Sequence, residues 1–255
     1  ELGVGGVQAR TFHAAALRQL SYFWPKVVGG APPRILEHKA PVIAQAAGLL
    51  SLSVDRVSVR DLASEVEWSK VSLVSADDYV RATTAIDRPA PAGYDRQTVA
   101  RLITAYEDVK TERGVIDFED VLLMLADMLN TRRDVAETVR GQYRRFVVDE
   151  YQDVSPLQHD LLQLWLGPRN DVCVVGDVSQ TIYSFAGASP EYLLGFGSEY
   201  EDAAVIRLEQ NYRSTPAIVA TANRLMRDKP GALLLHPASE RTGPAPVTTA
   251  YASDS

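Results

Sequence analysis

The sequence predicts an α/β protein with a parallel sheet, joined to a region that is entirely helical. The uninterrupted apolar runs FVV (146–148) and VCVV (172–175) suit strands that are covered on both faces. Between them, SPLQHDLLQLWL (155–166) has a helical pattern, and strand, helix, strand is the parallel crossover unit. The helical region is indicated by residues 34–113, which contain helical patterns and no convincing strand.

The elements before the sheet are expected to be mostly helices. After a strand-like piece within residues 4–10, a helix is predicted from Thr11 to Pro25, followed by the loop VVGGAPP (27–33). Within the helical region, RPAPAGYD (88–95) marks a turn.

Helix-start signals fix the elements from Gly114 onward. VIDFEDVLLMLADML (115–129) is an amphipathic helix entered through Asp117, and the helix between the strands has Ser155 as N-cap with a proline in its first turn. The apolar run AAVIRL (203–208) leads to a helix beginning near Pro216. The tail from residue 229 is expected to be loop-like.

Composition narrows the class of protein. The chain is 46% hydrophobic and 23% charged, which is ordinary for a soluble globular protein. A net charge of −7 argues against a diffuse basic coat for nucleic acid, although a local basic channel stays possible. Cys173, the only cysteine, lies in an apolar run and is predicted to be buried in a reducing compartment. No apolar run or signal-peptide pattern indicates a membrane, so a cytoplasmic location is expected.

Acidic residues follow both predicted strands. Asp149 and Glu150 come directly after the first, and Asp177 follows the second. Parallel sheets carry their ligand sites beyond the carboxyl ends of the strands. A carboxylate there can hold a hydrated Mg²⁺ beside a nucleotide, and its neighbour can orient the attacking water. An isolated acidic pair more often caps a strand, so other residues must decide.

Two further polar residues favour a phosphate site. Gln180 follows Asp177 by three positions, and its neutral amide could sense a phosphate oxygen. Arg213 lies just before a predicted helix start, where a guanidinium and a helix N-terminus could both face phosphate.

Five sequence blocks, in order, resemble a known family. DEYQD (149–153), GDVSQTIYSFAGA (176–188) and LEQNYRST (208–215) resemble motifs II, III and IV of the UvrD/Rep/PcrA group of superfamily 1 DNA helicases. TFHAAALRQL (11–20) is similar to the family's TFH segment, which contacts single-stranded DNA, and IDFEDVLLML (116–125) to the DFDDLL helix before motif II. The resemblance implies an ATP-dependent helicase that translocates 3′ to 5′ on single strands and unwinds duplex DNA, with a role in repair.

The resemblance also implies roles for single residues. Asp149 would help to hold Mg²⁺, Glu150 would activate the hydrolytic water, Gln180 would contact the γ-phosphate, and Arg213 would be an arginine finger. The other nucleotide-binding residues are expected to be Asp177 and Tyr212, the latter against the adenine, and the residues that contact DNA to be Thr11, His13, Tyr183 and Phe185.

The motif III block departs from the family. The family usually has tryptophan and arginine where this chain has Phe185 and Ala186. Phenylalanine keeps a smaller stacking face, on which a base is worth about 1–3 kcal/mol. Alanine removes a guanidinium, so a weaker grip on DNA is expected here.

The implied fold is an incomplete RecA-like parallel-sheet NTPase domain with an inserted all-helical subdomain. No Gly-Lys pair occurs, so the phosphate loop G-x-x-x-x-G-K-[ST] is missing, and the chain is expected to be an internal segment of a longer helicase with uncovered strand edges and apolar surface. The expected divisions are 1–29 and 114–208 for the first motor domain, 30–113 for the inserted subdomain, and 209–255 for motif IV and the start of the second motor domain. ATP and Mg²⁺ are the implied cofactors, and single-stranded DNA, a duplex junction and DNA-repair proteins the implied partners.

Three alternatives stay open. The carboxylates could hold two metals for phosphodiester cleavage in a nuclease, but Gln180 and Arg213 would then be unexplained. The chain could be a non-catalytic DNA-binding module, or belong to the motor subunit of a helicase–nuclease complex that processes double-strand breaks.

Overall fold

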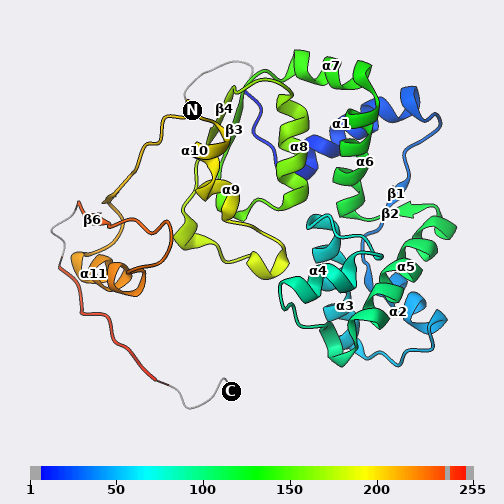
Figure 1. Ribbon diagram of the computed structural model, residues 1–255, viewed down its shortest axis with the longest axis horizontal. Coiled ribbons are helices and arrows are strands. Elements are labelled where there is room, and N and C mark those ends of the chain that lie inside the picture. Colours follow the sequence, from blue (N-terminus) through cyan, green and yellow to red (C-terminus); the bar gives the residue numbers. More distant parts are fainter. Residues whose placement is uncertain (1–6, 239–241, 251–255) are drawn as a thin grey trace.

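The structure, a computed structural model, describes residues 7–238 and 242–250 (Figure 1). Residues 7–10 form no strand, and the rest of the strand-like piece expected at 4–10 lies outside the described residues. A first core is built by four helices around Leu20, Leu122, Leu125 and Leu161. These helices are α1 (Phe12–Val27), α6 (Phe118–Thr131), α7 (Arg133–Gln142) and α8 (Pro156–Leu166).

Helix α1 continues past the proline that was expected to end it. It runs through Pro25 to Val27, so the predicted end was wrong. A proline removes one intrahelical N–H donor. Pro25 lies in the last turn, where the N–H of Val28 still bonds the Trp24 carbonyl at 2.9 Å, and the helix tolerates the loss.

The helical region forms a second core, separate from the first. We use this name for α2 (Ala40–Leu49), α3 (Arg56–Val71), α4 (Tyr79–Ala85), the 3₁₀ turn η1 (Pro91–Gly93) and α5 (Arg96–Arg113). Its buried side chains include Ile43, Leu62, Tyr79, Leu102 and Tyr106. The predicted helical character is confirmed, and Figure 1 shows these helices grouped at one end of the molecule.

A two-stranded parallel ladder joins the two ends of the helical region. Strand β1 (Arg34–Ile35) pairs with β2 (Val115–Ile116), so the expectation of no strand near residue 34 was wrong. Two residues are too few to show the alternating pattern of a strand in the sequence. These residues form a strand because they pair with a segment that is distant in the chain. The chain therefore enters and leaves the helical region at the same place.

The predicted parallel crossover is confirmed. Strands β3 (Phe146–Val148) and β4 (Val172–Val174) are parallel, with α8 between them in the chain. The predicted caps are also confirmed, because Ser155 and Asp117 each form a capping box at the start of α8 and α6. Beyond β3 the ladder continues, since Val175 N–H bonds the Val148 carbonyl at 2.8 Å and Tyr151 N–H bonds the Val175 carbonyl at 2.9 Å.

One face of the β3–β4 pair is open. Val147 is 76% exposed and Val175 is 49% exposed, and Cys173, opposite Val147 in the register, is exposed as well. The predicted burial of Cys173 was wrong because the run VCVV is covered on one face of the sheet and not on both. The expectation of uncovered apolar strand surface is confirmed.

The chain from residue 190 onward is made of short elements. They are α9 (Glu191–Leu194), α10 (Phe196–Glu199), β5 (Gln210–Asn211), α11 (Pro216–Leu225) and β6 (His236–Pro237). The apolar run 203–208 adopts no regular structure, and Ile206 in it is 81% exposed. Figure 1 shows α11 at the end of the molecule away from the helical region. Among the described helices, none has the length and apolar character needed to cross a bilayer.

Candidate functional site

The turn after β3 presents two carboxylates to solvent. Asp149 and Glu150 are both exposed, and the Asp149 carboxylate accepts a hydrogen bond of 3.0 Å from the Glu150 N–H. Glu150 adopts left-handed backbone angles (φ 52°, ψ 43°). A non-glycine residue there costs of order 1–3 kcal/mol, and such residues cluster at functional sites. The local backbone thus turns sharply at the residue that the sequence singled out.

A buried glutamine links the ends of the two strands. The Gln152 side chain donates from Nε2 to Glu150 Oε2 at 2.7 Å, and its Oε1 accepts from the Asp177 N–H at 3.0 Å. Gln152 is 1% exposed, and a Cβ at Gly176 would lie 2.7 Å from its Oε1. Residue 176 must therefore lack a side chain for this bridge to form.

Asp177 organises the loop after β4. Its Oδ1 accepts from the Ser179 N–H at 2.9 Å, and its Oδ2 accepts from Gln180 Nε2 at 2.9 Å. A continuous hydrogen-bond chain therefore runs from Glu150 through Gln152 and Asp177 to Gln180. We call Asp149, Glu150, Gln152, Asp177 and Gln180 the acidic edge.

Tyr212 and Arg213 do not join the acidic edge. The Tyr212 hydroxyl donates to Gln210 Oε1 at 3.0 Å, and the Arg213 N–H donates to Asn211 Oδ1 at 3.0 Å. Both residues are exposed just before α11. Within the described residues, no hydrogen bond or ion pair connects them to the carboxylates.

His13 lines a groove of about 920 Å³ between α1, α3 and the start of α6. Its ring packs edge-on against Phe118, with centroids 5.9 Å apart. Burial lowers the pKa of His13, and the charge of Lys39 lowers it further, while Glu67 opposes the shift. Thr11 is exposed and caps α1 through a 3.2 Å bond from the Ala14 N–H.

The groove carries charges of both signs. Lys39 pairs with Glu67 at 2.8 Å and with Glu119 at 2.6 Å, so its charge is locally balanced. Arg56 and Arg60 also line the groove, and Phe118 is 51% exposed. The groove thus combines cations with an aromatic face, and none of these lining residues except His13 was singled out by the sequence.

Tyr183 and Phe185 form an exposed aromatic pair. They flank Ser184 in the short turn η4 (Ser184–Ala186) and are 51% and 70% exposed. Their ring centroids lie 6.3 Å apart with planes inclined by 49°. Two exposed rings on one turn are the kind of surface on which unpaired bases stack.

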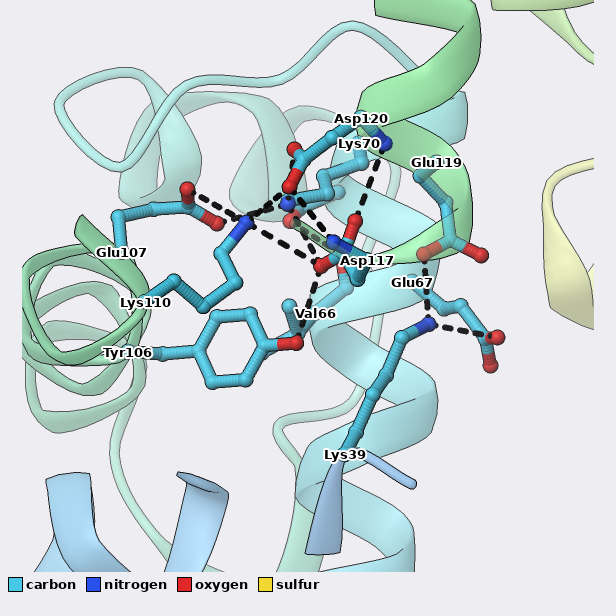
Figure 2. Close-up of polar contacts among 11 residues, drawn as sticks. Lys39, Val66, Glu67, Lys70, Tyr106, Glu107, Lys110, Asp117, Glu119 and Asp120 are labelled. Atoms are coloured by element: carbon cyan, nitrogen blue, oxygen red, sulfur yellow. Dashed lines mark hydrogen bonds and ion pairs between the residues drawn. The ribbon is translucent and has the colours of Figure 1, made fainter. Parts of the chain in front are cut away.

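A buried ion cluster fastens the helical region to α6 (Figure 2). Lys70 Nζ, from α3, lies 2.7 Å from Asp117 and 2.6 Å from Asp120, and Lys110 Nζ, from α5, pairs with the same two carboxylates and with Glu107. The Tyr106 hydroxyl donates to Asp117 Oδ2 at 2.9 Å. Figure 2 shows both ammonium groups between the acidic side chains.

The two ammonium groups of this cluster offset most of the charge of its three carboxylates. Burial alone would lower the pKa of Lys70, but the charges of Asp117, Glu107 and Asp120 outweigh it and raise the pKa. Burial would raise the pKa of Asp117, but Lys70 and Lys110 hold it well below its usual range. Although the oxygens of Glu107, Asp117 and Asp120 have the spacing of a metal site, the two ammonium groups already pair with all three carboxylates and offset two of their three negative charges.

The parallel crossover, with acidic loops at the carboxyl ends of its strands, defines an α/β domain. The model of the family "UvrD/REP helicase N-terminal domain" matches residues 3–201, so the chain belongs to this family, and a RecA-like fold follows from that membership.

Relatives with established names cover most of the chain. It is 49% identical over 228 residues to "ATP-dependent DNA helicase UvrD2" of Mycobacterium bovis and to the protein of the same name in Mycobacterium tuberculosis, covering 88% of this chain and 32% of each relative. It is 28% identical over 218 residues to "ATP-dependent DNA helicase PcrA" of Leuconostoc citreum, covering 85% of this chain and 28% of that protein. The chain therefore spans about a third of the length of these relatives.

Proposed function

We propose that the chain is the part of an ATP-dependent DNA helicase that carries the carboxylates for ATP hydrolysis and one section of the DNA track. The observation that carries this proposal is the hydrogen-bond chain from Glu150 to Gln180 at the carboxyl ends of two parallel strands. The printed names of the relatives support it, since each is an ATP-dependent DNA helicase.

The acidic edge has the donor set that Mg²⁺ requires. Asp149 is exposed, and one of its oxygens is oriented by a backbone N–H, which leaves the other oxygen for a hydrated cation. Mg²⁺ bound with ATP would supply neutralisation of the phosphate charge. We assign the role of metal ligand to Asp149.

Glu150 is proposed as the general base. One of its oxygens is held by Gln152, so the side chain has a fixed direction and the second oxygen can accept a proton from water. Gln180 contacts the γ-phosphate in this proposal, and its bond to Asp177 ties it to the same edge. Loss of the γ-phosphate on hydrolysis would thus change the contacts of Gln180, which lies on the loop that continues to Tyr183 and Phe185.

Tyr212 and Arg213 are proposed to complete the nucleotide site, although they lie outside the acidic edge. Both are exposed, and the hydrogen bonds described for them are local, to Gln210 and Asn211, which suits groups that reach the nucleotide when two motor domains close. We propose that Tyr212 packs on the adenine and that Arg213 stabilises the charge of the transition state.

The DNA track is proposed to include Thr11, His13, Tyr183 and Phe185. The groove beside His13 and the exposed aromatic pair support this, although they lie on different elements. We propose the helical region as the inserted subdomain, because its two ends meet at the β1–β2 ladder and its core is separate. The divisions at residues 29, 113 and 208 remain part of the proposal, as do 3′ to 5′ translocation, repair partners, a duplex junction and a cytoplasmic location.

The test compares ATP turnover with and without single-stranded DNA in the full-length gene product and in the 255-residue chain. The full-length product is expected to show turnover that DNA stimulates, and its Glu150→Gln variant to bind ATP without that turnover. Robust hydrolysis by the 255-residue chain alone would contradict the assignment. Metal-dependent DNA cleavage without ATP would favour a nuclease instead.

A further inference from the structure

The aromatic turn η4 lies directly against the helical region. Gly187, which ends the turn with φ 98°, approaches α3 so closely that a Cβ there would lie 2.6 Å from Val71 Cγ2 and 3.6 Å from Trp68 Cδ1. Residues separated by more than a hundred positions therefore share one contact. The exposed rings of Tyr183 and Phe185 stand on a turn whose other side is supported by α3.

A single guanidinium from the helical region reaches this turn. Arg88 Nη2 donates to the Phe185 carbonyl at 3.2 Å. Among the described residues, this is the only side-chain hydrogen bond that reaches residues 182–188. The turn itself contains no lysine or arginine, so the cation that contacts it, Arg88, comes from elsewhere in the chain.

Arg88 is itself held in place by buried groups. Its Nε and Nη2 donate to the Glu65 carboxylate at 3.0 Å and 2.9 Å, and its Cζ lies 3.9 Å above the centre of the Trp68 ring. Glu65 is 4% exposed and also accepts a 2.6 Å bond from the Tyr79 hydroxyl. A planar fork bound on two sides loses little further freedom when it makes one more hydrogen bond.

We propose that Arg88 is a positioning residue, which fixes the backbone at Phe185 so that the Phe185 ring is oriented to stack on a base of single-stranded DNA. This rests on the proposed function of the turn. The bond to the Phe185 carbonyl restrains the backbone of the residue that carries the exposed ring. Because Glu65 and Trp68 of α3 hold the Arg88 guanidinium, this backbone is held at a fixed position relative to α3. The orientation of the Phe185 ring is thus set by the helical region.

The experiment measures the affinity of the full-length gene product for a fluorescent oligo-dT strand without nucleotide. Phe185→Ala is expected to weaken binding by about fivefold or more, because stacking of one base is worth about 1–3 kcal/mol. Arg88→Gln is expected to weaken it by about twofold or more, the smallest effect of coupled neighbours. In the double variant, Arg88→Gln should add nothing to the loss from Phe185→Ala.

Matched variants show whether Arg88 acts by positioning the turn, by its charge or only by supporting the fold. Arg88→Lys keeps the charge but loses the fork, so it should behave as Arg88→Gln. Arg81→Gln removes an exposed arginine of the same helical region, paired only with Asp78, and should bind as the unchanged protein does. Gly187→Ala should weaken binding while Arg88 is intact, because it displaces the turn from α3. Hydrogen exchange of residues 182–188 without DNA should be faster in Arg88→Gln.

The outcomes distinguish the two proposals. If the unchanged protein does not bind the strand, the DNA role of the turn fails, and the positioning role fails with it. If it binds and Arg88→Gln has full affinity, or if the losses from Arg88→Gln and Phe185→Ala multiply, only the positioning role is wrong. Unchanged exchange at residues 182–188 would overturn the positioning role even if Arg88→Gln were too unstable for titration, since Arg88→Lys can be measured in its place.

Discussion

Lys70 Nζ lies 2.7 Å from Asp117 Oδ2, and this contact joins two hydrophobic cores that share no helix. Lys70 belongs to the helical region, and Asp117 caps α6. The same oxygen accepts hydrogen bonds from Tyr106 at 2.9 Å and from Lys110 at 3.3 Å. Asp117 is 1% exposed, so neither water nor salt screens its contact with Lys70 effectively.

Lys70→Met should destabilise the chain by about 3–5 kcal/mol, because it leaves buried carboxylates with one ammonium in place of two. Urea unfolding at neutral pH measures the loss. Arg60→Met is the matched control on the same helix, since Arg60 is exposed and pairs only with Asp61, and it should change stability by less than about 0.5 kcal/mol. If Lys70→Met lowers the free energy of unfolding by less than about 1 kcal/mol, the cluster does not stabilise the attachment of the helical region to α6.

Stability should fall in acid because of Asp117. Its pKa is held below the ordinary value in the folded chain, so the unfolded chain binds a proton at higher pH than the folded chain does. The stabilisation is therefore present above about pH 4 and is lost as the pH falls further. Asp117→Asn should flatten this acid dependence between about pH 5 and 2, whereas Asp127→Asn, at an exposed site on the same helix, should leave it nearly unchanged. Equal slopes in both variants would assign the acid transition to other groups.

Gly176→Ala should disrupt the acidic edge. The added Cβ would lie 2.7 Å from Gln152 Oε1 and 2.9 Å from Leu193 Cδ2, so Gln152 must release the Asp177 N–H. We expect a stability loss of about 1–3 kcal/mol and, in the full-length product, a fall in ATP turnover. Gly197→Ala is the control, because nothing lies within 4 Å of its Cβ position. Normal turnover in Gly176→Ala would show that the Gln152 bridge is dispensable.

Arg213→Ala should lower DNA-stimulated ATP turnover of the full-length product by about three to five orders of magnitude, the range for arginine fingers. Its effect on stability should be small, since the residue is exposed before α11. Arg207→Ala removes an arginine that is exposed on the same segment and should retain turnover. If both variants are equally active, the finger must be another residue.

Short-range signals made much of the fold predictable. Asp117 and Ser155 fixed helix starts, because a capping side chain and its N–H partner lie within one turn of chain. The β3–β4 pairing followed from two apolar runs around one helix. The β1–β2 ladder and α7 were not anticipated, since a two-residue strand has no period and no capping side chain marks the start of α7.

The site was predictable in its residue types and less so in its connections. Asp149, Glu150, Asp177 and Gln180 were expected at one edge, and the structure brings them together, although their catalytic roles are still to be tested. Gln152 was missed because only its burial and its reach across to Gly176 give it a role. Arg88 and Lys70 were missed for the same reason, as their partners lie 97 and 47 positions away.

The open face of the β3–β4 pair makes Cys173 a natural reporter. As the only cysteine, it would accept a single thiol-directed dye, placed opposite the exposed Val147 at the centre of the uncovered sheet. Labelling of the 255-residue chain should be fast. Slower labelling in a longer polypeptide would show that additional strands or helices shelter this face, and the dye would then measure their docking directly.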